Sequence, residues 1–391
     1  MPDVLQSIQD LLIMLASFVV VLSVVVFVHE FGHFQMARWR GVAIDTFSIG
    51  FGKTLLGWRD KSGVQWKIGA LPLGGYVKFA DDADAMSTGP REKIVDPVAL
   101  AEARGRGLFH AQSLSTRSLV VAAGPLTNFI FSILAFAMLA FIVGRDTPTR
   151  IDRVSPGSAA ESAGMIPGDV ILSINGQAVA SFEDIQPVVS SSLNVPLQVV
   201  VQRGPSEVPL TVTPRASPSN PNAGAMGVAH EASFATRERI DPLSALGEGA
   251  KNTWNIVAQT GAYLGAVITG RESGDQIAGP LGIINVSGQV ANSALSGGDD
   301  GDWAGRLGIL VLSLLNLAAV LSVAVGIVNL LPIPILDGGH LLFYGIEAVR
   351  GGRPLPASAQ EWAYRAGFAV MASLFLFATW NDITRLFPGA Q

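Results

Sequence analysis

The sequence contains no cysteine among its 391 residues. This absence excludes disulfide bonds, thiolate metal ligands and cysteine nucleophiles, so any metal chemistry falls to the five histidines and the carboxylates. A chain without cysteine suits an oxidising or a reducing compartment, and its location must be inferred from other features.

Charged residues are also scarce. They make up 15% of the chain, whereas a soluble domain carries roughly 25%, so much of this chain must face something other than water. The formal net charge of -5 shows no basic excess, which argues against a nucleic-acid partner.

Long apolar stretches take the place of the missing charges. Four of them are candidate transmembrane helices: 11–28, 118–143, 307–331 and 366–380. About 20 apolar residues cross a bilayer as a helix, so the fourth stretch needs a further turn at either end. The first stretch is too long for a signal peptide and has no basic residue before it, which predicts a retained helix.

Basic residues predict the orientation of these spans. The chain before the first span has no Lys or Arg, whereas residues 38–117 carry many. By the positive-inside rule that segment is cytoplasmic, and the N-terminus and the segment after the second span lie outside.

The spans and the segments between them predict seven parts. We expect a first span at 1–38, a cytoplasmic-side β-hairpin region at 39–117, a second span at 118–143, a globular domain at 144–215, a linker with juxtamembrane helices at 216–306, a third span at 307–340, and a cytoplasmic loop with the fourth span at 341–391.

Short patterns predict local structure within these parts. Alternating apolar residues at 64–68 and 75–79 indicate a hairpin or small sheet near the membrane, and the polar stretch 81–107 is expected to be a mobile loop. Asn175-Gly176 is a strong turn signal inside the globular domain. The apolar segment 242–268 is expected to lie on the membrane surface or to pack on a span.

The motif His29-Glu30-Phe31-Gly32-His33 follows the apolar stretch of the first span. Residues four apart share one face of a helix, so both imidazoles can bind one metal ion while Glu30 acts as general base on a metal-bound water. Chance would explain such a motif on a soluble helix. Ionisable residues at the end of a membrane span are costly and normally mark a function, which favours a metal site.

A catalytic zinc ion needs a third protein ligand and an open position for water. The predicted topology puts the ends of the first and third spans on the same side, where the segment 329–340 contains Asp337 and His340. Asp337 is the expected ligand and His340 its rival. Asn329 is expected to bind the substrate backbone or stabilise an oxyanion, with a helix-packing amide as the alternative.

These motifs together resemble the site-2 protease family of intramembrane zinc metalloproteases. Members of that family combine His-Glu-x-x-His in the first span with Asn-x-x-Pro-x-Pro-x-Leu-Asp-Gly in a later span, and this sequence has both. The resemblance covers nearly the whole chain. Residues 155–171 resemble a bacterial PDZ domain, which makes the chain most similar to the regulator of sigma-E protease branch. The segment 216–306 shows no second PDZ signature, so one such domain is expected.

The resemblance implies the zinc site and the reaction. Zn²⁺ would be the cofactor, bound by His29, His33 and Asp337, with Glu30 as the catalytic acid and base. The reaction would be regulated intramembrane proteolysis by a zinc metalloendopeptidase. Its substrates would be single-span proteins, such as anti-sigma factors or remnant signal peptides, after a first extracytoplasmic cut.

The resemblance also implies substrate-binding residues. Gly124 and Asn128 match a Gly-x-x-x-Asn element near the active site, for which a small-residue helix contact is the alternative. Residues 64–79, with Val77, resemble a membrane-associated hairpin that pairs with an unwound substrate strand.

The expected fold is therefore a polytopic α-helical membrane protein with about four transmembrane helices, a membrane-associated β-hairpin or sheet, and one periplasmic PDZ-like α+β domain. The expected location is the bacterial inner membrane, with the N-terminus periplasmic and the active site toward the cytoplasmic side. Two other classes of protein stay open. One is a membrane metal transporter, which also uses intramembrane His and Asp but needs polar residues at several depths, whereas here they cluster at one end. The other is a non-catalytic PDZ adaptor, which would leave Glu30 without a role.

Overall fold

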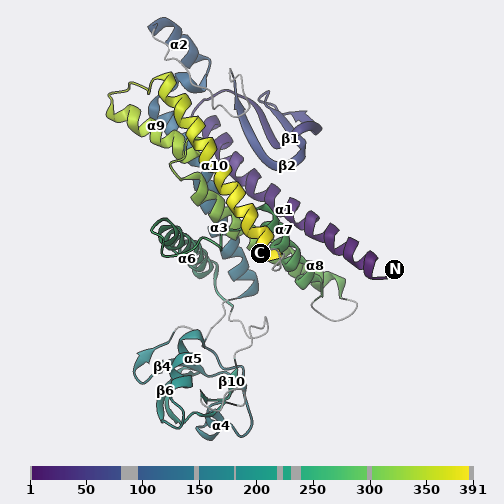
Figure 1. Ribbon diagram of the computed structural model, residues 1–391, viewed down its shortest axis with the longest axis vertical. Coiled ribbons are helices and arrows are strands. Elements are labelled where there is room, and N and C mark those ends of the chain that lie inside the picture. The colour runs from purple at the N-terminus through teal and green to yellow at the C-terminus, as the bar shows by residue number, and fades with distance from the viewer. Residues whose placement is uncertain are drawn as a thin grey trace. The chain divides into compact units, whose positions relative to one another are not determined.

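A computed structural model describes residues 2–80, 96–144, 149–179, 182–217, 223–229, 239–296 and 302–386. The chain forms two compact units, shown in Figure 1. Unit 1 combines Met1–Met138 with Leu246–Gln391, and unit 2 is Leu139–Ala245.

Four helices of the described chain are long and apolar enough to cross a membrane. They are α1 (Pro2–Trp39), α3 (Leu114–Val143), α8 (Trp303–Asn329) and α10 (Ala357–Leu386). Each covers one of the apolar stretches found in the sequence, although α8 ends at Asn329, before the end of the third stretch at 331. The fourth helix extends beyond its stretch at both ends, as the short apolar run requires. Large apolar side chains on these helices remain exposed, for example Leu12, Leu134 and Phe375, which is the pattern expected of surfaces in contact with lipid. The prediction of a polytopic membrane protein is confirmed at this level.

Two long strands form the sheet of unit 1, β1 (Ile44–Arg59) and β2 (Gln65–Phe79). They pair antiparallel along three stretches: 44–49 with 75–79, 46–49 with 65–68, and 54–59 with 65–69. The two segments expected to form a hairpin or small sheet are both parts of β2, and they belong to one sheet in which stretch 46–49 of β1 lies between them and pairs with both. Positive φ angles of 84° at Gly50 and 80° at Gly52 bend β1 after this stretch.

The segment expected to be a mobile loop contains a helix, α2 (Pro97–Gly105). Asp96 caps this helix by accepting hydrogen bonds from the backbone N–H groups of Val98 and Ala99, and Pro97 occupies the first turn. The loop prediction is therefore wrong for this part, because the capping residues outweigh its polar composition. Residues 81–95 of the same prediction lie outside the described residues.

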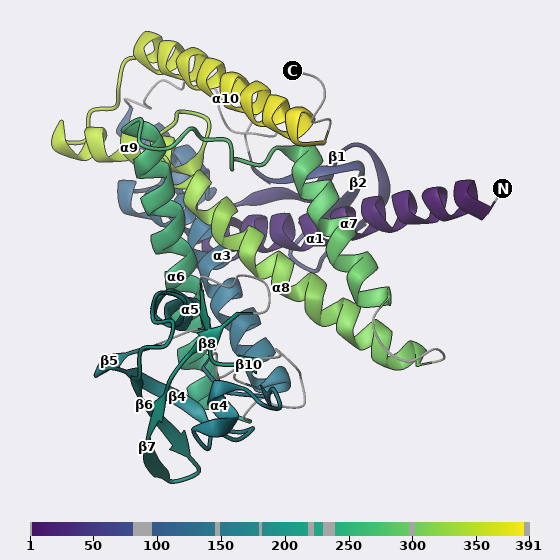
Figure 2. The same cartoon turned by 60° about the horizontal axis from the view of Figure 1, so that its bottom comes forward.

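Three more helices complete unit 1: α6 (Pro242–Ile268), α7 (Pro280–Ser296) and α9 (Asp337–Val349). Helices α1, α7 and α8 pack against one another, as Figure 2 shows. Gly249 of α6 lies directly against the backbone carbonyl of Ile133 on α3. Of the two alternatives for the 242–268 segment, this contact supports packing on a span.

Unit 2 contains a four-stranded antiparallel sheet in the order β5-β4-β6-β7. Its strands are β4 (Val170–Ile174), β5 (Gln177–Ala178), β6 (Leu197–Arg203) and β7 (Ser206–Val212), and its helices are α4 (Ala159–Ser162) and α5 (Phe182–Ser191). Asn175 and Gly176 form the predicted turn with φ angles of 51° and 79°.

The fold of unit 2 continues past residue 215, where the domain was expected to end. Strand β8 (Arg215–Ala216) pairs with β9 (Gly224–Ala225), and β10 (Val228–Ala229) pairs with β3 (Arg153–Val154). Met226, between β9 and β10, is buried in the core of the unit. The polar composition of 216–224 concealed this, because the apolar side chains that pack on the core, Met226 and Val228, come after it. The PDZ-like character of this unit stays a prediction.

Candidate metal centre

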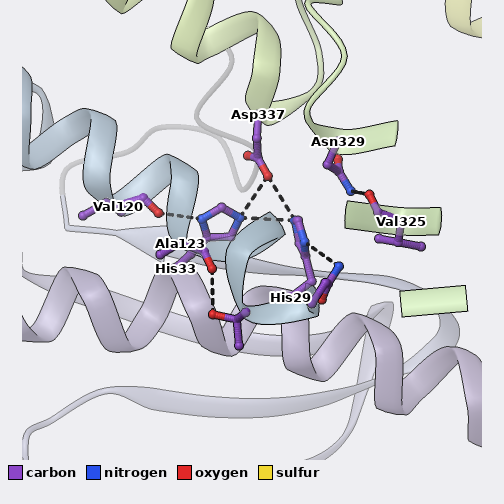
Figure 3. A network of polar contacts seen from close by, with 9 residues as sticks. His29, His33, Val120, Ala123, Val325, Asn329 and Asp337 are labelled. Carbon is purple, nitrogen blue, oxygen red and sulfur yellow. Dashed lines mark hydrogen bonds and ion pairs between the residues drawn. The ribbon is translucent and has the colours of Figure 1, made fainter. Parts of the chain in front are cut away.

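Two histidines face each other at the end of α1. His29 and His33 lie one helical turn apart, and their Nε2 atoms are 3.2 Å from each other (Figure 3). The rings stand edge to face with centroids 4.8 Å apart. The i, i+4 spacing thus aims two ring nitrogens at one point.

A carboxylate from the far end of the sequence reaches the same point. Oδ2 of Asp337 lies 3.2 Å from Nε2 of His29 and 3.4 Å from Nε2 of His33. Two imidazole nitrogens and one carboxylate oxygen thus meet at one point, as the ligands of a single metal ion must.

The local sequence explains why Asp337 stands there. Pro334 cannot continue α8, and the chain turns tightly through 330–336 before α9 begins at Asp337. Gly338 and Gly339 lie against backbone carbonyls of this turn, at Leu330 and Ile333, where a Cβ atom would collide. The two glycines let the chain fold back closely enough to place the carboxylate beside α1.

The three side chains fit a zinc ion. Ligand atoms about 2.0–2.1 Å from a tetrahedral ion lie about 3.3–3.4 Å from each other, and the three measured separations are 3.2, 3.2 and 3.4 Å. Apart from the two imidazoles, no described residue offers Oδ2 of Asp337 a hydrogen bond. His29, His33 and Asp337 form the one such cluster among the described residues. Three protein ligands leave a fourth position for water or substrate.

Glu30 lies beside the cluster and against β2. The backbone N–H of Val77 donates to its carboxylate, and Gly75 packs so closely that a Cβ atom there would come within 2.9 Å of Glu30 Cγ. The stretch 75–79 pairs with β1 on one side, and no described strand pairs with its other side. An unpaired strand edge therefore lies next to the carboxylate predicted to act as acid and base.

Helix α3 supports the two histidines from behind. Nδ1 of His33 donates to the backbone carbonyl of Val120 over 2.9 Å, and Gly124 faces the same imidazole ring. Nδ1 of His29 lies 3.3 Å from Nδ2 of Asn128. The structure thus brings Gly124 and Asn128, predicted to bind substrate, into contact with the predicted metal ligands.

Asn329 and His340 lie at the edge of the cluster. The Nδ2 group of Asn329 donates to the carbonyl of Val325 in its own helix, over 3.0 Å (Figure 3). The His340 ring packs near Tyr364, with centroids 6.0 Å apart, and His340 is outside the three-residue cluster. Of the two rival ligands, the geometry favours Asp337.

Sequence reasoning missed the carbonyl of Val120 and the ion pair between Arg117 and Glu347. A backbone carbonyl has no residue type, so no motif can signal its role. An arginine at the start of an apolar span was a possible signal for the ion pair, because a charge there needs a partner.

Four membrane-length helices, a two-histidine, one-carboxylate cluster and an adjacent glutamate are the features of a membrane metallohydrolase. The comparison with known proteins agrees. Residues 17–374 match the model of Peptidase family M50, the site-2 protease family, and the chain belongs to that family.

Relatives of nearly the same length carry matching names. The chain is 43% identical over 380 residues to a protein of Rhizobium meliloti (strain 1021) named as a putative zinc metalloprotease, covering 95% of this chain and 96% of that protein. It is 42% identical over 386 residues to metalloprotease MmpA of Caulobacter vibrioides, covering 96% of each. The family and zinc as its cofactor are therefore confirmed, which argues against the transporter and adaptor alternatives.

Proposed function

We propose that this chain is an intramembrane zinc endopeptidase that cleaves the transmembrane segments of single-span proteins. In this proposal His29, His33 and Asp337 hold the zinc ion, and Glu30 is the catalytic acid and base. The observation that carries it is the match between the three ligand separations of 3.2–3.4 Å and a tetrahedral zinc site.

Bound zinc supplies an activated water, whose pKa it lowers to about 7. The chain's own residues then move the protons. Glu30, next to His29 in the sequence, takes a proton from the water and returns it to the leaving amine. Asn329 lies near Asp337, and its amide would donate to the developing oxyanion after releasing the Val325 carbonyl.

The strand edge at 75–79 accounts for substrate binding in this proposal. A transmembrane helix hides its scissile carbonyl in its own hydrogen bonds, so the substrate must unwind before it is cut. An unwound stretch can pair with an exposed strand edge, and this edge runs past Glu30 through Val77. Cleavage would therefore occur where the substrate is extended.

The remaining parts of the proposal concern location and partners. The basic residues between the first two spans favour a cytoplasmic-side active site in a bacterial inner membrane, with the N-terminus and unit 2 periplasmic. Unit 2 would act as a PDZ-like domain that recognises an exposed chain end. Substrates would be proteins already cut outside the membrane, such as anti-sigma factors in a sigma-E stress response, or remnant signal peptides.

The test is cleavage of a model single-span substrate by the purified full chain in detergent. Glu30→Gln should lower the rate by about 10²–10⁴-fold while zinc stays bound, and a chelator should abolish cleavage until zinc is restored. Glu361→Gln is the matched control, because Glu361 is exposed on α10. Wild-type rates from Glu30→Gln would rule out the assigned mechanism.

A further inference from the structure

Two residues of α3 repeat the spacing of the two histidines on α1. Gly124 and Asn128 are four residues apart, like His29 and His33. Gly124 faces His33, and Asn128 faces His29. The Gly-x-x-x-Asn element therefore lies behind the metal cluster, one residue for each imidazole.

Asn128 is held rigidly in its place. Its side chain is fully buried, and its backbone carbonyl accepts hydrogen bonds from Ser132 Oγ at 2.9 Å and from Ser322 Oγ on α8 at 3.1 Å. The first bond lies within α3, and the second joins this turn of α3 to α8. The amide therefore meets His29 with little freedom to move.

The amide of Asn128 has one unused polar atom. Nδ2 lies 3.3 Å from Nδ1 of His29, and Oδ1 is buried without a partner among the described residues. A half-turn of the amide presents Oδ1 to the same ring nitrogen. Oδ1 then accepts the Nδ1–H proton, which leaves a lone pair on Nε2, the atom aimed at Asp337.

Gly124 serves the second imidazole by having no side chain. A Cβ atom at this position would overlap the ring of His33 at Nε2. The His33 ring can therefore pack directly against the α3 backbone at Gly124, while its Nδ1 donates to the Val120 carbonyl at 2.9 Å. This bond again leaves Nε2 free to bind a metal ion.

We propose that Asn128 and Gly124 are positioning residues for the two histidine ligands, and that neither contacts substrate. Asn128 fixes the tautomer and orientation of His29, and Gly124 leaves the space that the His33 ring occupies. This inference rests on the proposed function, because it takes His29 and His33 to be zinc ligands. It replaces the substrate-binding role that the resemblance implied for both residues.

The test is zinc affinity, measured by competition with a chromogenic chelator on the purified full chain in detergent. Asn128→Asp keeps an acceptor for Nδ1–H and should bind zinc within about threefold of the wild type. Asn128→Leu has similar size but no acceptor and should bind zinc about 10–100-fold more weakly. A residue that only packs between helices would give the reverse order, because a buried apolar side chain is then favoured over a buried charge.

Gly124→Ala should also weaken zinc binding by at least tenfold. Gly308→Ala on α8 is its control, since a Cβ atom there meets nothing within 4 Å, and it should bind zinc like the wild type. Wild-type zinc affinity in both Asn128→Leu and Gly124→Ala would overturn the inference. A raised KM for the model substrate with unchanged zinc affinity would overturn it in favour of substrate contact.

The proposed function is tested separately by Asp337→Asn in the same assay. If the wild type binds zinc and Asp337→Asn does not, the ligand set stands whatever the α3 variants do. If Asp337→Asn binds zinc like the wild type, Asp337 is not a zinc ligand and the proposed ligand set fails. The zinc affinities of the α3 variants then still show whether Asn128 and Gly124 support the two histidines.

Discussion

Arg117 and Glu347 join the helix that supports the histidines to the helix that supplies the aspartate. Nη2 of Arg117 on α3 lies 2.8 Å from Oε1 of Glu347 on α9, and both side chains are largely buried. The guanidinium also lies over the ring of Tyr344, 4.9 Å from its centroid. Arg117 stands one turn before Val120, and Asp337 begins α9, so this ion pair ties together two sides of the metal cluster.

We expect Glu347→Ala to destabilise the protein by about 3–5 kcal/mol, because it leaves a buried arginine without its partner. The double variant Arg117→Leu with Glu347→Leu should lose less than the single variant, since no charge remains buried. Thermal unfolding in detergent measures both. Equal losses in the two variants would show that packing, and not the charge pair, holds α3 to α9.

Asp382 explains two glycines at the start of α7, Gly279 just before the helix and Gly282 in its first turn. Its carboxylate is buried and accepts hydrogen bonds from the backbone N–H groups of Gly279 at 3.0 Å and Gly282 at 2.9 Å. A Cβ atom on either glycine would lie 2.6 Å from this carboxylate. The segment 279–283 is thus where the end of α10 attaches to the start of α7.

We expect Asp382→Asn to cost about 1–3 kcal/mol, because the amide can accept only one of the two hydrogen bonds. Protease susceptibility of α10 in the full chain provides the measurement. Glu361→Gln, on the exposed side of the same helix, is the control and should change little. Equal susceptibility in the two variants would contradict the role given to Asp382.

Asp169 makes the stability of unit 2 depend on pH. Burial opposes ionisation of this carboxyl, but the hydrogen bonds and charge of Arg203, with the N–H of Ile166, outweigh burial and lower the pKa of Asp169. A group with a lowered pKa in the folded state stabilises the fold above its unfolded pKa of about 3.9. That stabilisation is lost as the pH falls below this value toward the folded pKa.

Hydrogen exchange at the β4 and β6 amides, corrected for the intrinsic effect of pH, should therefore show protection falling below about pH 4. Asp169→Asn should be less protected at neutral pH by roughly 2 kcal/mol and should lack this acid-dependent step. A step of wild-type size in Asp169→Asn would assign the pH dependence to another group.

Asn329 offers a test of catalysis that leaves the metal in place. Its amide donates to Val325 within its own helix, and Asn329 is not one of the three residues that would hold zinc. If it stabilises the oxyanion, Asn329→Ala should lower kcat by about 10²–10³-fold with unchanged zinc content. Loss of zinc together with activity would instead show that Asn329 supports the metal site.

Much of the membrane fold followed from the sequence because it depends on local composition. Uncharged apolar runs need lipid or protein around them, so the four spans were visible without tertiary information. The pairing of β1 with β2 was not, because alternation marks a strand but says nothing about its partner. The helix at 97–105 was missed because the polar composition of 81–107 predicted a loop.

The metal cluster also depends partly on the local sequence and partly on the tertiary structure. The spacing of His29 and His33 by itself determines that two imidazoles share a helix face, because the helical period is the same in any context. Only the tertiary structure brings Asp337 to within 3.2 Å of His29, and only it shows that Asn128 and the Val120 carbonyl lie behind the rings. A residue that holds a ligand in place does so through its position between packed helices, and the Gly-x-x-x-Asn spacing on α3 does not by itself say which distant residues it faces.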